Sequence, residues 1–83
     1  MRPENAEALN NRGNTLKELK RFDEALASYD RALAVRPEHA ETLYNRGNTL
    51  KELKRFDEAL ASYGRALAVR SDYGEVHWNE SLA

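Results

Sequence analysis

The sequence predicts an all-α protein in which antiparallel helical hairpins stack side by side as a solenoid. The stretch NRGNTLKELKRFDEALASY occurs twice without a change, at 11–29 and 45–63, so the chain repeats itself with a period of 34 residues. Within each unit, apolar residues recur at steps of three and four, which is the spacing of a helix and not of a strand. The two units differ at only five positions, which are Asn5/His39, Ala8/Thr42, Asn10/Tyr44, Asp30/Gly64 and Pro37/Ser71.

The first unit, residues 4–37, contains two expected helices. The first covers residues 6–19 with Asn5 as its N-cap, since asparagine is a favoured capping residue. The second begins with acidic residues in its first turn, which complement the helix dipole. It ends before Pro37, because a helix rarely continues into proline. Each unit is therefore expected to be a helical hairpin.

The rest of the chain continues the same pattern within one domain, residues 1–83. The second unit covers residues 38–71, and residues 72–83 align with the first helix of a partial third unit that acts as a capping helix. About five helices are expected in total. The tripeptide Arg-Pro-Glu at residues 36–38, where the second unit begins, also occurs at residues 2–4, ahead of the first unit. The chain therefore looks like a piece of a longer array.

Composition excludes several classes of function. With 13 basic and 14 acidic residues the net charge is −1, so the chain lacks the positive field that non-specific binding to nucleic acid or to anionic membranes needs. The absence of cysteine excludes disulfides and thiolate sites. No apolar run approaches the roughly 20 residues that cross a bilayer, and the polar start is unlike a signal peptide. A soluble, cytoplasmic protein is the default expectation.

The sequence offers no set of residues for catalysis. His39 and His77 stand alone, and no nucleophile, base and orienting group recur at a spacing that would bring them together. We therefore expect no enzymatic activity, no cofactor and no metal site.

The residues at fixed places in each unit resemble the tetratricopeptide repeat, whose 34-residue pattern is W-x2-L-G-x2-Y, then A-x3-F, then P. The first unit matches this frame with Leu9, Arg12, Gly13, Leu16, Ala25, Tyr29, Ala32 and Pro37. The departures are leucine for two aromatic residues, tyrosine for phenylalanine and arginine for the leucine before glycine. The small residues have a physical reason, because glycine and alanine let the two helices approach closely.

The resemblance implies a right-handed superhelix whose first helices line a concave groove that holds an extended peptide or a partner helix. The partner is thus expected to be a protein or peptide. Asparagine suits such a groove, since its amide offers donors and acceptors to any peptide backbone. The implied binding residues are Asn10, Asn14, Lys17, Tyr44, Asn45, Asn48, Lys51 and Trp78.

Structural roles for these residues stay open beside the binding role. The asparagines are equally suited to hydrogen bonds between helices, and Tyr44 and Trp78, one period apart, either form a platform for a ligand or simply pack.

In one well-known site of the family, basic residues and asparagines in the groove bind the C-terminal carboxylates of a chaperone tail. Asn14 and Asn45 match the asparagines, but Asn10, Glu75 and Asn79 stand where the basic residues belong. The resemblance therefore implies no binding to such a tail.

Three other functions compete with peptide binding. Self-association through a terminal helix is the strongest, because two nearly interchangeable units invite oligomers or exchange of hairpins, and Val76, Trp78 and Leu82 would form the contact. An engineered repeat protein would behave in the same way. Residues 76–82 also resemble the last repeat of bacterial arrays that precede a sugar-transferase domain, which would make the chain the recognition arm of a larger enzyme. Helical repeats that read RNA are disfavoured by the period and the charge.

Overall fold

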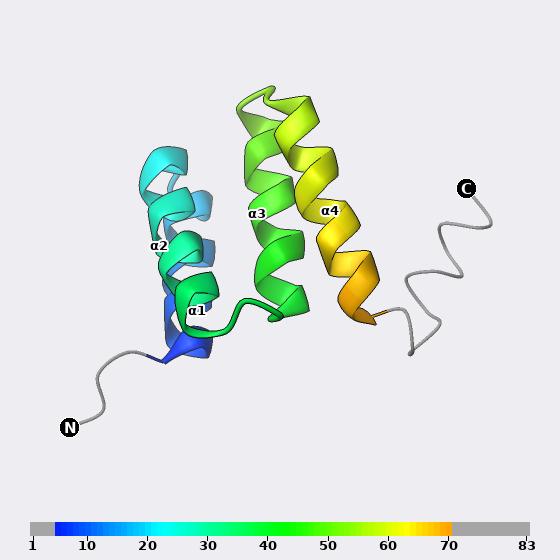
Figure 1. Ribbon diagram of the computed structural model, residues 1–83. Coiled ribbons are helices and arrows are strands. Elements are labelled where there is room, and N and C mark those ends of the chain that lie inside the picture. The colour runs from blue at the N-terminus through cyan, green and yellow to red at the C-terminus, as the bar shows by residue number, and fades with distance from the viewer. Residues whose placement is uncertain (1–4, 71–83) are drawn as a thin grey trace.

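The computed structural model describes residues 5–70 and shows four α-helices joined by short turns (Figure 1). They are α1 (Ala6–Glu18), α2 (Phe22–Val35), α3 (Ala40–Glu52) and α4 (Phe56–Arg70). The all-α helical-repeat prediction is thus confirmed, with one hairpin in each repeat. The fifth expected helix lies outside the described residues. Within residues 5–70, no helix is long and apolar enough to cross a membrane.

Side chains cap the first helix of each hairpin, although the capping residue differs. Asn5 Oδ1 accepts hydrogen bonds from the amides of Glu7 at 2.8 Å and Ala8 at 3.2 Å. In the second hairpin, His39 Nδ1 accepts from the Thr42 amide at 3.3 Å. Both caps satisfy amides that the first turn of a helix leaves unpaired. The Asn5/His39 difference between the repeats therefore preserves the cap.

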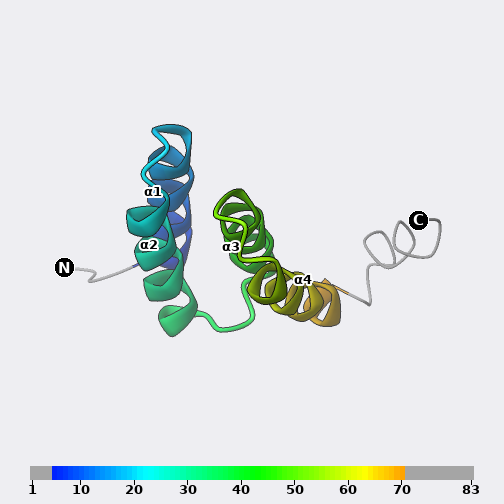
Figure 2. The same ribbon diagram turned by 90° about the horizontal axis from the view of Figure 1, so that it is seen from above.

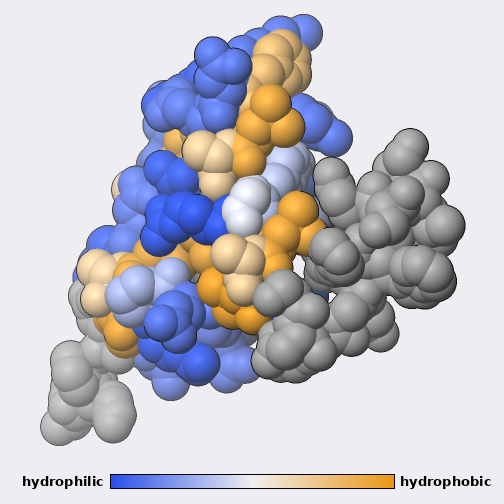
Figure 3. Space-filling model, turned by 45° about the vertical axis from the view of Figure 1, so that its right-hand side comes forward, coloured by the Kyte–Doolittle hydropathy of each residue, from blue (hydrophilic) through white to orange (hydrophobic). Residues whose placement is uncertain are grey.

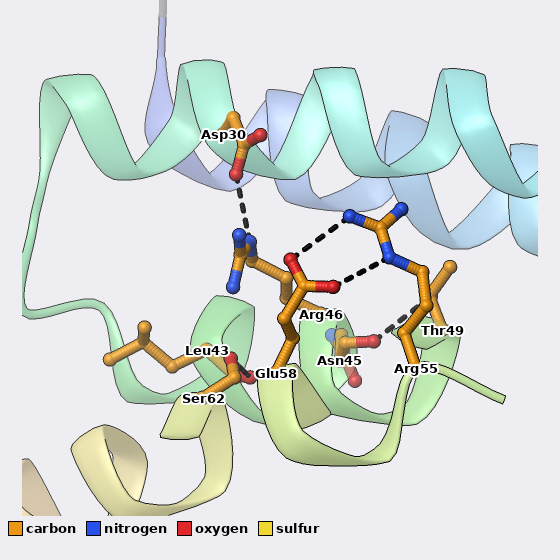
Figure 4. Close-up of polar contacts among 8 residues, drawn as sticks. All are labelled: Asp30, Leu43, Asn45, Arg46, Thr49, Arg55, Glu58 and Ser62. Atoms are coloured by element: carbon orange, nitrogen blue, oxygen red, sulfur yellow. Dashed lines mark hydrogen bonds and ion pairs between the residues drawn. The ribbon is translucent and has the colours of Figure 1, made fainter. Parts of the chain in front are cut away.

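The turn inside each hairpin places a lysine in the left-handed region. Lys20 and Lys54 both have φ of 64°. The next amide in each turn, from Arg21 or Arg55, reaches back 2.9 Å to the carbonyl of Leu16 or Leu50, which is the pattern of a Schellman motif. Glycine usually fills this place, so lysine here offers no signal from which the turn type could be predicted. Figure 4 shows Arg55 then pairing with Glu58 on the first turn of α4, at 2.7 Å.

In each hairpin, the ring of a tyrosine on the second helix packs directly against a glycine on the first helix. A Cβ on Gly13 would lie 2.5 Å from Tyr29 Cε1, and one on Gly47 would lie 2.6 Å from Tyr63 Cε1. A buried serine adds a hydrogen bond between the helices, since Ser28 Oγ donates to the Leu9 carbonyl at 2.8 Å. Ser62 does the same in the second hairpin, as Figure 4 shows. These contacts hold the two helices of a hairpin at close range.

The hairpins stack through α2 and α3, which bury side chains against each other. Leu26 shares one core cluster with Leu50, and Leu33 shares another with Leu43. Figure 2 shows the result from above, with α1 and α3 on one side of the stack and α2 and α4 on the other. The first helices of both repeats therefore contribute to a common face.

Candidate functional site

Asn10 and Asn45 join α1 to α3 by a hydrogen bond across the common face. Asn45 Nδ2 donates to Asn10 Oδ1 at 3.0 Å. Asn10 is only 1 % exposed, and its own Nδ2 is buried with no hydrogen-bond partner among the described residues. The expectation that Asn10 presents its side chain in an open groove is therefore wrong, because the stacking of the hairpins buries it. Asn45 stays half-buried and keeps its side-chain oxygen unpaired within residues 5–70.

Asn14 and Asn48 are held by the tyrosines that close the hairpins. The Tyr29 hydroxyl donates to Asn14 Oδ1 at 2.6 Å, and the Tyr63 hydroxyl donates to Asn48 Oδ1 at 2.5 Å. Both amides are half-buried. Within the described part of the chain, their Nδ2 groups donate no hydrogen bond to the protein and remain available as donors. Hydrogen bonds between helices thus orient these amides without using all their capacity.

Tyr44 lies on the same face and is the exposed aromatic residue there. It is 53 % exposed, and its ring is tilted by 48° against that of Tyr63 at a centroid separation of 5.6 Å. Such a tilted geometry is favourable for aromatic pairs. Lys17 and Lys51 follow Asn14 and Asn48 by three residues on α1 and α3, and Lys17 is half-buried whereas Lys51 is exposed. Trp78, Val76 and Leu82 lie outside the described residues.

The sequence interpretation missed three polar features between elements. Ser28 and Ser62 were not singled out, although their hydroxyls are buried. The ion pair between Asp30 on α2 and Arg46 on α3, at 2.8 Å, was also missed. The only sequence signal for it was that Asp30 is one of the five positions that differ between the repeats.

The asparagines of the common face lie apart from the pocket described for residues 5–70. An open pocket of about 520 Å³ lies elsewhere, between residues 35–41 and the end of α4, and is lined there by Val69 and Arg70. None of the asparagines described above contributes to it. The candidate site on the common face is therefore separate from this pocket.

The comparison with known families agrees with this architecture. A family model described as tetratricopeptide repeat matches residues 4–72. The chain belongs to the tetratricopeptide repeat family. No curated protein matches it.

Tetratricopeptide repeats generally mediate protein–protein interactions and are typically non-enzymatic modules. In this tetratricopeptide repeat chain, residues 5–70 contain no group of three or more His, Cys, Asp or Glu side chains that would hold a metal ion. The common face of α1 and α3 carries six of the residues that the sequence predicted for binding, which are Asn14, Lys17, Tyr44, Asn45, Asn48 and Lys51.

The tyrosines that orient the asparagines predict a loss of stability at alkaline pH. Burial raises the pKa of Tyr29 above its usual value of 10.0, and the nearby Thr49 hydroxyl offsets part of that rise. The folded state then holds this proton more tightly than the unfolded state, so the free energy of unfolding falls as the pH rises above about 10. Urea unfolding between pH 7 and pH 11 measures this slope.

Tyr29→Phe is the matched variant for this experiment. At pH 7 it costs about 1 kcal/mol, because the hydrogen bond to Asn14 is lost. Above pH 10 its slope is shallower than that of the wild type, since no phenol titrates at this position. Identical slopes for the two proteins would show that Tyr29 does not carry the alkaline transition.

Proposed function

We propose that this chain is a non-enzymatic scaffold that binds an extended segment of a partner protein along the common face of α1 and α3. One observation carries the proposal. Each of three asparagine side chains on this face uses one atom of its amide in a hydrogen bond to the protein and leaves the other atom without a partner within residues 5–70. Asn14 and Asn48 offer donors, and Asn45 offers an acceptor. A peptide backbone in an extended conformation presents the complementary carbonyl and amide groups.

Preorganisation supports this role. A free asparagine side chain loses rotamer freedom when it binds, and that loss subtracts from affinity. Here the Tyr29 and Tyr63 hydroxyls and the Asn10 amide already hold the three side chains. The structural and binding roles of these asparagines are therefore complementary, because the hydrogen bonds between helices prepare the groups that face the ligand.

Tyr44 supplies a place for a partner side chain. Aromatic residues are favoured anchors in protein interfaces, and Tyr44 is half exposed and steadied by the ring of Tyr63. Lys17 and Lys51 would favour acidic residues in the bound segment. The proposed ligand is thus an extended stretch of peptide whose backbone groups are free to form hydrogen bonds, with an apolar or aromatic side chain opposite Tyr44.

Selection from a random library of displayed peptides tests this function without a known partner. The immobilised full chain is expected to enrich a set of related sequences, and a selected peptide carrying a fluorescent label then gives an affinity by polarisation. Asn45→Ala is expected to weaken this peptide by about 5- to 20-fold, which corresponds to the loss of one or two hydrogen bonds.

Asn11→Ala is the matched control, since Asn11 occupies the same place in the first repeat but lies on the outer side of the stack and is exposed. It is expected to leave the affinity unchanged. Equal affinities for Asn45→Ala and the wild type, with the fold of both intact by circular dichroism, would contradict the assignment of this face.

A further inference from the structure

Residues that are identical in the two repeats differ sharply in exposure. Leu26 on α2 is 9 % exposed, whereas its copy Leu60 on α4 is 67 % exposed. Phe56 on α4 is 54 % exposed, while Phe22 on α2 is half-buried. Because the side chains are the same, the difference comes from their place in the stack.

For the first helices the difference is reversed: residues in the first repeat are more exposed than their copies in the second. Thr49 on α3 is completely buried, but its copy Thr15 on α1 is exposed. Leu19 after α1 is 58 % exposed, and its copy Leu53 is half-buried. The residues of α1 and its C-cap that are more exposed than their counterparts in the second repeat lie on one helical side. They form what we call the leading face: Ala8, Asn11, Arg12, Thr15 and Leu19.

A second surface, which we call the trailing face, runs along α4. It consists of Phe56, Leu60, Gly64 and Leu67, at helical steps of three and four. Figure 3 shows apolar side chains in a broken stripe on this side of the molecule. The trailing face repeats the side of α2 that packs on α3, with only Gly64 changed from Asp30.

These two faces are the two halves of a contact that the chain already makes once. Within the chain, α2 packs on α3, with Leu26 and Leu50 in one cluster. The leading face repeats the side of α3 that the stack buries, including Thr49 and Arg46, which pairs with Asp30 on α2. The trailing face repeats the α2 half of the contact. We propose that the trailing face of one copy of the chain packs on the leading face of a second copy, continuing the stack between molecules.

The polar contacts at this junction differ from those inside the chain. Figure 4 shows Asp30 on α2 reaching Arg46 on α3, at 2.8 Å. Between copies the corresponding pair is Gly64 and Arg12 of the second copy, so the ion pair is missing. The contact between molecules therefore lacks an ion pair and is weaker than the internal one. It also depends little on salt.

The geometry of the contact sets the kind of assembly. Two different faces meet, so the contact is heterologous and leaves one free copy of each face at the ends. Growth does not stop at a dimer. The average mass is expected to keep rising with concentration.

Sedimentation of the full chain over a wide concentration range tests this proposal. The wild type is expected to associate reversibly beyond a dimer, and Leu60→Glu to weaken association by at least about 10-fold, because a carboxylate would be buried without a partner. Gly64→Asp is expected to strengthen it by about 2- to 5-fold at low salt by supplying the partner of Arg12, with the gain lost near 0.5 M salt.

Gly64→Ala is the control for the gain, since it removes the glycine without adding a charge. Equal association of Gly64→Asp and Gly64→Ala at low salt would contradict the proposed register of the two faces. A wild type that stays monomeric at every concentration would overturn the proposal.

Two occupants could cover the trailing face: a second copy, or the chain's own C-terminal residues. The fluorescence emission of Trp78, the single tryptophan of the chain, distinguishes between them. It is measured at the lowest concentration, where the chain is monomeric. Unchanged emission in Leu60→Glu agrees with a second copy as the occupant. A shift in the monomer would show that the C-terminal residues cover the trailing face, and would overturn the proposal.

Discussion

Replacing Leu26 with alanine lowers the free energy of unfolding by about 2–4 kcal/mol. Leu26 is 9 % exposed and lies in the cluster that joins the two hairpins, with Leu16, Tyr29 and Leu50. The truncation leaves a cavity between the two hairpins. The surrounding helices are packed against other neighbours and cannot move in to fill it. Urea unfolding followed by circular dichroism measures the loss, and in so small a domain it is a large part of the total stability.

Leu60→Ala is the control, since it makes the same chemical change one period later. With 67 % of Leu60 exposed, the cost is expected to stay within about 0.5 kcal/mol at concentrations where the chain is monomeric. A loss at Leu60 as large as the loss at Leu26 would mean that the trailing face is covered in the monomer.

The second large effect concerns the glycines at the hairpin contact. Gly13→Ala is expected to destabilise the chain by about 1–3 kcal/mol, because its Cβ would lie 2.5–2.9 Å from three atoms of the Tyr29 ring. Tyr29 is fully buried and hydrogen-bonded to Asn14, so the ring has little freedom to move aside. The helix propensity of alanine offsets about 1 kcal/mol of the clash.

Gly64→Ala makes the same substitution where a Cβ would meet nothing within 4 Å. Here only helix propensity acts, and the chain is expected to gain about 0.5–1 kcal/mol. The two variants, measured by urea unfolding under the same conditions, should therefore move in opposite directions. Stabilisation by Gly13→Ala would contradict the close packing of Tyr29 on α1.

The repeat and its helical periodicity were sufficient to predict the fold. Leu9, Leu26 and Leu33 all lie in the core, as their spacing indicated, and Asn5 caps α1. These predictions succeed because periodicity reports which side of a helix is apolar, and a cap is a local feature.

Contacts between hairpins could not be predicted, because they depend on position in the stack. The sequence gives Leu26 and Leu60 identical surroundings, yet one is buried and the other exposed. Asn10 looked like a groove residue by its place in the repeat, but it is buried beside Asn45. The pairing of Asp30 with Arg46 also needs the relative placement of two helices, which no local pattern contains.

Nuclear magnetic resonance mapping of a selected peptide on the full chain tests the central claim most directly. The claim is that the common face of α1 and α3 binds an extended peptide through amides that the fold already holds. Titration at a low protein concentration is expected to shift the side-chain amides of Asn14, Asn45 and Asn48 and the ring signals of Tyr44. Shifts confined to Phe56 and Leu60 on α4 would contradict the claim.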